Sequence, residues 1–154
     1  MSFLRRPSKP ALILVGMIGV LIGLGSYTFV YARGYSYLSD NPEACVNCHI
    51  MREQFNGWTK SSHKAFATCN SCHVPHDLVG KYMTKAENGF WHSWYFTFQN
   101  FHEPIQMREK SRVIVQENCL GCHGQFVSSI TNHDGADEVN CIQCHSGVGH
   151  DPTQ

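Results

Sequence analysis

The feature that most constrains this chain is a short pattern, Cys-x-x-Cys-His, which occurs four times in 154 residues and includes all eight cysteines. The four copies are Cys45-Val-Asn-Cys48-His49, Cys69-Asn-Ser-Cys72-His73, Cys119-Leu-Gly-Cys122-His123 and Cys141-Ile-Gln-Cys144-His145. Two thiols at this spacing form thioether bonds to the two vinyl groups of a haem, and the histidine that follows binds the iron from one side. The pattern therefore predicts four covalently bound haem c groups.

Other uses of paired cysteines fit the pattern less well. Zinc knuckles contain Cys-x-x-Cys pairs, but they do not need a histidine directly after every second cysteine. A disulfide across two residues closes too short a loop to stabilise a fold much. A thioredoxin-like redox pair occurs once, beside a βαβ unit that this sequence lacks. The agreement of all four pairs with one pattern therefore favours a tetrahaem cytochrome c.

This haem content limits the fold class. Residues 32–154 would have to house four haems, which leaves about 31 residues for each, too few for an ordinary hydrophobic core. We therefore expect the haems themselves to form the core of a compact domain that is mainly α with much coil and no sheet. The low content of β-branched residues, and turn-rich stretches such as residues 128–138, favour the same fold class.

The N-terminal segment has a different composition. Residues 11–31 contain no charged side chain, and a helix of this length spans the hydrocarbon core of a bilayer, about 30 Å thick. A cleaved signal peptide is the main alternative, but its apolar region usually runs to about 15 residues at most. A buried soluble helix is less consistent, because the segment is apolar all round. The sequence therefore predicts a single transmembrane anchor.

The charges before the anchor predict its orientation. Three basic residues precede it, and positive charges tend to stay on the cytoplasmic side. We therefore expect a cytoplasmic N-terminus at residues 1–10, a transmembrane helix at 11–31 and a periplasmic haem domain at 32–154, in a bacterial inner membrane. Four tyrosines between Tyr27 and Tyr37 would form an aromatic belt at the periplasmic interface.

Each haem iron also needs a second axial ligand. Six histidines lie outside the motifs: His63, His76, His92, His102, His133 and His150. The first motif alone has a methionine two residues after its histidine, at Met51. A thioether there would bind the first iron and change its potential, or would simply line an apolar haem crevice. Spacing by itself leaves these alternatives open.

The segment between the second and third motifs is unusually aromatic, with seven aromatic residues between Phe90 and Phe101. On a helix, Lys85 and His92 fall on one face of this segment. A basic and aromatic amphipathic helix is typical of a membrane surface, although aromatic residues equally cover a haem. Quinol oxidation is the function that joins a membrane to a haem, and Lys85 and His92 would then hydrogen-bond the ring oxygens and accept protons.

The whole set of features resembles one known family. The anchor, the four haem motifs, the Cys-His-x-Met of the first motif and the stretch CNSCHVPHDLVGK around the second resemble the NapC/NirT family of membrane-anchored multihaem quinol dehydrogenases. The resemblance implies a protein that takes electrons from menaquinol and passes them to a periplasmic multihaem reductase in an oligomeric complex. The most similar branch serves the pentahaem enzyme that reduces nitrite to ammonia.

The resemblance also implies axial ligands. It places Met51, in place of the motif histidine His49, on the first iron. It makes His63 and His150 the distal ligands of two bis-histidine haems. The motif histidines His73, His123 and His145 keep their usual role as iron ligands.

Further residues receive roles in the same way. The resemblance places Lys85 in the quinol site. His92 stands where relatives can carry an acidic residue beside the first haem, so it either binds that iron or serves the quinol as a base. His133 matches a ligand of the fourth haem, a position that a lysine of the catalytic partner can fill instead. His76 is expected to bond to a propionate or the backbone, and His102 to lie in a turn.

Charge distribution separates the functions that remain. These are an electron donor to a nitrite reductase, a donor to another periplasmic reductase, and a small terminal reductase with an open haem iron. All 12 lysines and arginines lie at or before Arg112, and residues 113–154 carry five acidic side chains. An acidic end suits docking of a basic partner better than attraction of an anion such as nitrite. The formal net charge of zero argues against nucleic-acid binding.

Overall fold

The computed structural model describes residues 7–131 and 139–150, and these residues form helices and loops without a β-strand. The chain divides into two compact units, Met1–Ser36 and Tyr37–Gln154, and each is described by itself. The predicted fold class, mainly helical with much coil and no sheet, is confirmed for the described part of the chain.

The first unit contains α1, Lys9–Tyr31, a helix of 23 residues. Pro10 lies in its first turn, where a missing N–H removes no helical hydrogen bond. At 1.5 Å per residue the helix is about 34 Å long, and by length and composition it is able to cross a membrane. Its residues are apolar on all sides after Lys9 and none is buried, a composition typical of a membrane-spanning helix.

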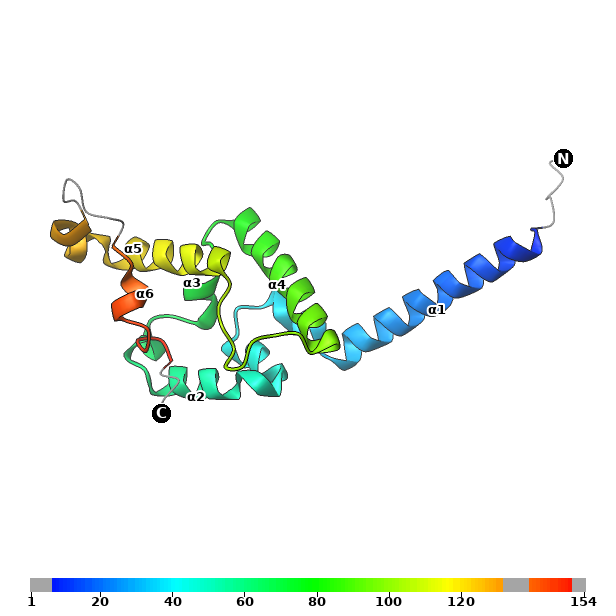
Figure 1. Ribbon diagram of the computed structural model, residues 1–154, viewed down its shortest axis with the longest axis horizontal. Coiled ribbons are helices and arrows are strands. Elements are labelled where there is room, and N and C mark those ends of the chain that lie inside the picture. Colours follow the sequence, from blue (N-terminus) through cyan, green and yellow to red (C-terminus); the bar gives the residue numbers. More distant parts are fainter. Residues whose placement is uncertain (1–6, 132–138, 151–154) are drawn as a thin grey trace. The chain divides into compact units, whose positions relative to one another are not determined.

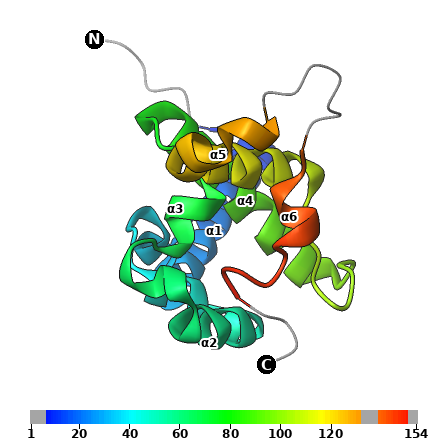
Figure 2. The same ribbon diagram turned by 90° about the vertical axis from the view of Figure 1, so that its left-hand side faces the viewer.

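The second unit is an assembly of short helices around two longer ones. In chain order the helices are η1 (Gly34–Leu38), which leads into this unit, η2 (Pro42–Asn47), η3 (His49–Met51), α2 (Arg52–Lys60), η4 (Ser62–Ala65), α3 (Cys69–His73), α4 (Leu78–Phe98), α5 (Glu109–Thr131) and α6 (Cys141–Cys144). The most extensive packing joins α3 to α5, and α6 also packs against α5. Figure 1 and Figure 2 both show α3 between α5 on one side and α2 on the other.

The second unit has very little apolar core of its own. Among the described residues, the buried apolar side chains are Val74 and Ile114, which are 5% and 7% exposed. Phe66, by contrast, is 92% exposed. A folded chain of this length normally buries more than half of its surface. The polypeptide alone therefore does not supply the core, in agreement with a core made of haem.

One local expectation is wrong. The sequence predicts turns from residue 128, but α5 continues to Thr131; positions 132–138 lie outside the described residues. The hydroxyl of Ser128 donates to the carbonyl oxygen of Gln125 at 3.1 Å. A serine that bonds back to the preceding turn is tolerated within a helix, which explains why the turn-forming composition does not end α5 there.

Candidate haem sites and quinol site

Three of the four haem motifs begin in short helical segments whose starts are capped. The first motif spans η2 and η3, the second forms α3, the third lies inside α5 and the fourth begins with α6. Asn41 caps η2 by accepting a hydrogen bond from the Glu43 N–H. Thr68 and Ser71 form a capping box at α3, and Asn140 caps α6. These caps explain why such short segments are helical.

Helical geometry places the reactive residues of a motif on one side. In α3, Cys69, Cys72 and His73 stand at offsets of zero, three and four residues and so share a face. All eight cysteines are free of disulfide bonds. Two thiols and an imidazole on one helix face are what covalent haem attachment requires. The residues of this motif therefore fit a haem c group.

Two histidines from outside the motifs lie against motif histidines. The ring centroids of His63 and His123 are 6.2 Å apart, and those of His73 and His150 are 6.0 Å apart. An iron between two imidazoles would hold their centroids about 6 Å apart, because a metal–nitrogen bond is about 2 Å long and each ring centre lies about 1 Å further on. Both pairs therefore fit bis-histidine haems, His63 serving the third motif and His150 the second.

The protonation and burial of these histidines fit the same role. Burial, and secondly the nearby His150, lowers the pKa of His73 to about 4. Its ring is therefore neutral at pH 7, as an iron-binding imidazole must be. Nδ1 of His63 is buried without a hydrogen-bond partner. Burial of such an unpartnered atom lowers the stability of the fold by about 1–3 kcal/mol. Contact with the iron or a propionate of a bound haem would remove this cost.

The other predicted ligands are not brought into such pairs within residues 7–131 and 139–150. His49 and His145 are exposed, whereas Met51 is half-buried beside the first motif. His92 lies on α4, apart from any second imidazole among the described residues. His133 falls outside the described residues.

The two histidines that were given no ligand role behave as expected. Nε2 of His76 lies 3.0 Å from the carbonyl oxygen of Ser71, so the backbone is its partner. His102 is exposed and precedes a bend at Glu103 and Pro104. Neither position argues for iron binding.

Two side-chain amides of α5 connect the motifs, and the sequence patterns did not identify them. Asn118 donates from Nδ2 to the carbonyl oxygens of Cys72 and Val74, both at 2.9 Å. Gln116 accepts from the N–H of Cys141, the first residue of the fourth motif, at 2.9 Å. The helix that carries the third motif therefore also holds the second and the fourth.

The cysteines show that consecutive motifs are neighbours. The thiols of Cys69 and Cys45 lie within hydrogen-bonding reach, and this contact is the main reason why the pKa of Cys69 is raised. Burial, then Cys141 and then Cys72, raises the pKa of Cys119. The first motif is thus next to the second, the second next to the third, and the third next to the fourth.

Lys85, the predicted quinol lysine, is a buried side chain of α4 that is only 4% exposed. Its ammonium donates to the carbonyl oxygen of Ser39 at 2.7 Å and to Oδ1 of Asp40 at 3.1 Å. A third contact, to the carbonyl oxygen of Leu38, is long at 3.4 Å. The other oxygen of Asp40 pairs with Lys81, and these two lysines, Lys81 first, lower the pKa of Asp40 to about 2.

His92, the predicted base, lies two turns beyond Lys85 on α4, about 10.5 Å along the helix axis. Although the residue is exposed, desolvation of its ring by neighbouring groups, and secondly the charge of Arg108, lowers its pKa. Arg108 is held 6.0 Å above the Trp91 ring and 3.2 Å from a carboxylate oxygen of Glu87. A neutral imidazole is able either to accept a proton or to bind iron, so both predicted roles stay open.

Tyr37 is one of the four tyrosines predicted for an interfacial belt, and it packs against α4. Its ring is half-buried beside Gly89 of α4, which has no side chain to occupy that space. Burial is the main cause that raises its pKa to about 12. Tyr37 is therefore part of the packing around the first motif.

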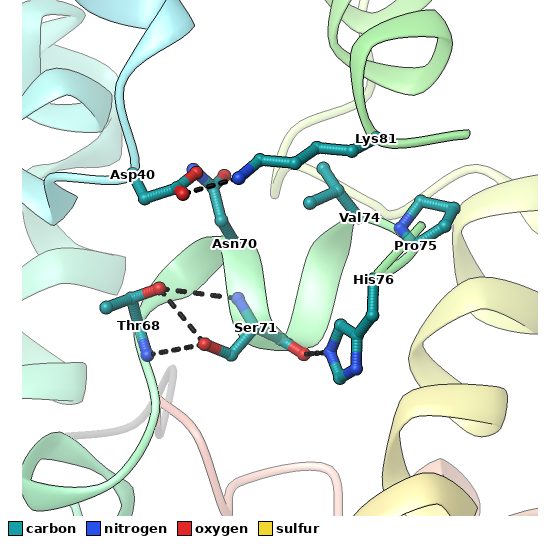
Figure 3. A pocket seen from close by; sticks show the side chains of 8 residues that line it. All are labelled: Asp40, Thr68, Asn70, Ser71, Val74, Pro75, His76 and Lys81. Atoms are coloured by element: carbon teal, nitrogen blue, oxygen red, sulfur yellow. Dashed lines mark hydrogen bonds and ion pairs between the residues drawn. The ribbon is translucent and has the colours of Figure 1, made fainter. Parts of the chain in front are cut away.

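A polar cleft of about 360 Å³ opens beside α3 (Figure 3). Asp40, Lys81 and His76 contribute to its walls, together with Asn70 and Ser71 of the second motif. On α3 these last two residues point away from the face that carries the cysteines and the histidine. The cleft therefore lies behind the predicted haem side of α3 and is a separate feature.

Comparison with known proteins agrees with this arrangement. The sequence model of the NapC/NirT cytochrome c family, N-terminal region, matches residues 5–154. The cytochrome c-type protein NrfH of Wolinella succinogenes is 37% identical over 145 residues, which covers 87% of this chain and 82% of the relative. The cytochrome c-type protein NapC of Escherichia coli is 26% identical over 177 residues, with 95% and 85% coverage.

One solved structure is similar to this chain over nearly the full length of both proteins. It is the crystal structure of the cytochrome c nitrite reductase NrfHA complex bound to the HQNO inhibitor, with a TM-score of 0.62, 27% identity, and coverage of 93% of this chain and 92% of that one. The family match extends over almost the whole chain, and family membership implies covalently bound haem c and, with the apolar α1, a membrane anchor. The chain therefore belongs to the NapC/NirT cytochrome c family.

Proposed function

We propose that this protein is a membrane-anchored tetrahaem cytochrome c that oxidises menaquinol and passes the electrons to a periplasmic multihaem reductase. The preferred partner is the pentahaem cytochrome c nitrite reductase, which forms ammonia. This chain would be the quinol-oxidising and electron-transfer subunit and would not reduce nitrite itself. The observation that carries the proposal is the likeness to a chain of the NrfHA complex over 93% of the present sequence.

The proposed topology places the haem domain in the periplasm. Helix α1 would cross the inner membrane once, with residues 1–10 in the cytoplasm and residues 32–154 outside. The length and apolar composition of α1 support the crossing, and the basic residues before it support the orientation. The menaquinone pool would then lie beside the region where the chain leaves the membrane.

Four haem c groups would be attached by the four motifs. When bound, each haem supplies an iron that accepts and releases one electron at a time. The chain's own contribution would be to attach and orient: the cysteines would form the thioethers, and the rings of His73 and His123 stand opposite those of His150 and His63. The contacts between consecutive motifs keep all four attachment sites close together.

The first and fourth haems are expected to differ from the two bis-histidine haems. At the first motif Met51 is half-buried and His49 is exposed, which supports Met51 as the protein ligand there, with His92 as a further candidate. At the fourth motif His145 would be one ligand. Its partner would be His133 or a lysine supplied by the reductase.

The quinol would be bound beside the first motif by residues of α4. Lys85 would donate a hydrogen bond to one ring oxygen, and this bond would strengthen as that oxygen releases its proton to the surrounding water. His92, whose lowered pKa favours the neutral form, would accept a proton when it is not an iron ligand. The two residues stand two helical turns apart, so they would address opposite ends of the ring.

Donation of electrons to another periplasmic reductase is the second candidate. It is favoured by the matches to NapC and to TorC of Escherichia coli, each 26% identical over at least 95% of this chain. The two candidates share the quinol chemistry and differ in the acceptor.

Nitrite consumption with and without a partner tests the proposal. The purified holoprotein, supplied with a reduced naphthoquinol, is expected to consume no nitrite alone. Addition of a pentahaem nitrite reductase should start quinol-dependent ammonia formation. Nitrite turnover by the isolated chain would contradict the proposal, and turnover only with a different periplasmic reductase would favour the second candidate.

A further inference from the structure

Asp40 occupies an unusual position between two lysines of α4. Its Oδ1 accepts from Lys85 at 3.1 Å, and its Oδ2 pairs with Lys81. A third donor, Nδ2 of Asn70, reaches Oδ1 at 2.8 Å. Both carboxylate oxygens are therefore engaged, and Oδ1 is held by two donors, Lys85 and Asn70, without the help of Lys81.

The two lysines differ in their surroundings. The Lys85 side chain is 5% exposed, and that of Lys81 is 22% exposed and lines the polar cleft in Figure 3. Removing an ammonium from water is costly unless charged and polar partners replace the water. For Lys85 those partners are the Asp40 carboxylate and two carbonyl oxygens. Asp40 supplies the negative charge among them.

The geometry leaves one hydrogen of the Lys85 ammonium weakly held. Contacts of 2.7 Å to Ser39 and 3.1 Å to Asp40 are good hydrogen bonds, whereas 3.4 Å to Leu38 is at the limit. A ring oxygen of a quinol would replace the third contact while the first two keep the ammonium aimed. In this arrangement Lys85 only donates a hydrogen bond to the ring oxygen, and Asp40 takes no part in proton removal.

Asp40 also connects this lysine to two haem motifs. Asn41, the next residue, caps η2, which contains the first cysteine of the first motif. Asn70 lies between the two cysteines of the second motif. A carboxylate at this junction fixes the Lys85 ammonium relative to the attachment sites of both haems.

We propose that Asp40 is a positioning residue of the quinol site, holding the Lys85 ammonium in place to bind a ring oxygen of menaquinol. The inference rests on the proposed function. Lys81 is the second cation on the same carboxylate, but its side chain is more exposed than that of Lys85 and lines the polar cleft. Asp40 therefore acts through Lys85, and Lys81 serves as the matched control.

The test compares Asp40→Asn, Asp40→Glu and Lys81→Gln in the full-length holoprotein in detergent, with a reduced naphthoquinol as electron donor. Asp40→Asn is expected to lower kcat about tenfold and to leave KM within about twofold. Without the carboxylate charge, the hydrogen bond from Lys85 to the ring oxygen is weaker, and this bond stabilises the oxygen most when the oxygen becomes negative in the transition state. Asp40→Glu should recover most of the rate, and Lys81→Gln should stay within about twofold of the wild type. Haem content and reduction by dithionite should be unchanged in all three.

A second measurement does not depend on turnover. Acetylation of lysines by a water-soluble ester, read by mass spectrometry, should modify Lys85 slowly in the wild type and at least about fivefold faster in Asp40→Asn, since the ammonium loses its charged partner. Lys110, whose side chain is 64% exposed, should react equally in both proteins. Unchanged kcat in Asp40→Asn, or unchanged Lys85 acetylation, would overturn the positioning role. A wild-type protein that naphthoquinol cannot reduce would instead overturn the proposed function.

Discussion

The second to fourth haem motifs and the first motif are held in place by different kinds of contact. Where α5 meets the second and fourth motifs the contacts are neutral: Asn118 and Gln116 bind main-chain groups of these motifs. Beside the first motif and along α4 the contacts are charged: Asp40 lies between two lysines of α4, and Glu87 of α4 lies between Arg108 and Lys110. Two pairs of imidazoles accompany the neutral region, and the described residues provide no such pair at the first motif.

This difference corresponds to the two proposed tasks. Neutral amide contacts do not change with pH and are little affected by salt, so they suit attachment sites whose spacing must stay constant. Charged groups change the energy of a nearby group that gains or loses charge. A quinol that releases protons is such a group, and it would react beside the charged region.

The largest expected effect is on the paired imidazoles. His63→Ala should remove the distal ligand of the third haem and convert about one quarter of all the haem from a low-spin to a high-spin form, because one of four irons loses a strong ligand. Electron paramagnetic resonance measures the fractions. His102→Ala, at an exposed position, is the control and should leave the spectrum unchanged. A normal spectrum for His63→Ala would show that the 6.2 Å pair with His123 is not an iron-binding pair.

The next effect concerns the charged region. Lys85→Leu should slow the reduction of the haems by naphthoquinol by about tenfold or more, because the donor to the ring oxygen is lost, while reduction by dithionite stays normal. Stopped-flow absorbance in the Soret band gives both rates. Lys81→Leu is the control, because Lys81 lies on the same helix and pairs with the same carboxylate but is not buried. Equal rates in Lys85→Leu and the wild type would place the quinol site elsewhere.

A smaller effect is expected in the neutral region. Asn118→Ala leaves two carbonyl oxygens, of Cys72 and Val74, without their donor and should lower the free energy of unfolding by about 2 kcal/mol. Thermal unfolding followed by circular dichroism measures the loss. Gln125→Ala, at an exposed site on the same helix, should cost less than about 0.5 kcal/mol. Similar losses in both variants would mean that Asn118 does not hold the second motif.

The smallest effect is a pH dependence confined to the charged region. The pKa of Asp40 is lowered to about 2 by Lys81 first and Lys85 second. A lowered carboxyl pKa in the folded protein stabilises the fold above about pH 4, and this contribution disappears as the pH falls toward 2. The difference in Tm between the wild type and Asp40→Asn should therefore be constant above pH 5 and shrink below pH 4. A constant difference down to pH 2.5 would contradict the ion-pair assignment.

The sequence predicts the haem chemistry well because that chemistry depends on local spacing. Cys-x-x-Cys-His is a contiguous pattern, and a charge-free stretch is directly visible at residues 11–31, where α1 is found. The fold class follows from the small number of residues available for each haem, which is too few for an ordinary hydrophobic core. The residues Lys85 and His92 are correctly placed on one helix, α4, because helical periodicity is also local.

The long-range contacts could not be predicted in this way. The pairing of His63 with the third motif, not with the second motif that follows it, depends on how α3 packs against α5. Asn118 carries a possible signal, since a polar amide directly before a motif cysteine is available to bind a neighbouring segment, but its target lies 44 to 46 positions away. No sequence motif identified Asp40 as part of a site. Tertiary packing, which a single sequence does not encode in any short window, determines these contacts.

The most direct test of the account is a single-turnover experiment with the complete holoprotein in lipid vesicles. A reduced menaquinol analogue is mixed anaerobically with the oxidised protein, and the Soret absorbance is followed before and after a pentahaem nitrite reductase and nitrite are added. We predict reduction of the haems by the quinol, followed by reoxidation only when both reductase and nitrite are present. Haems that stay oxidised with the quinol but are reduced by dithionite would contradict the account.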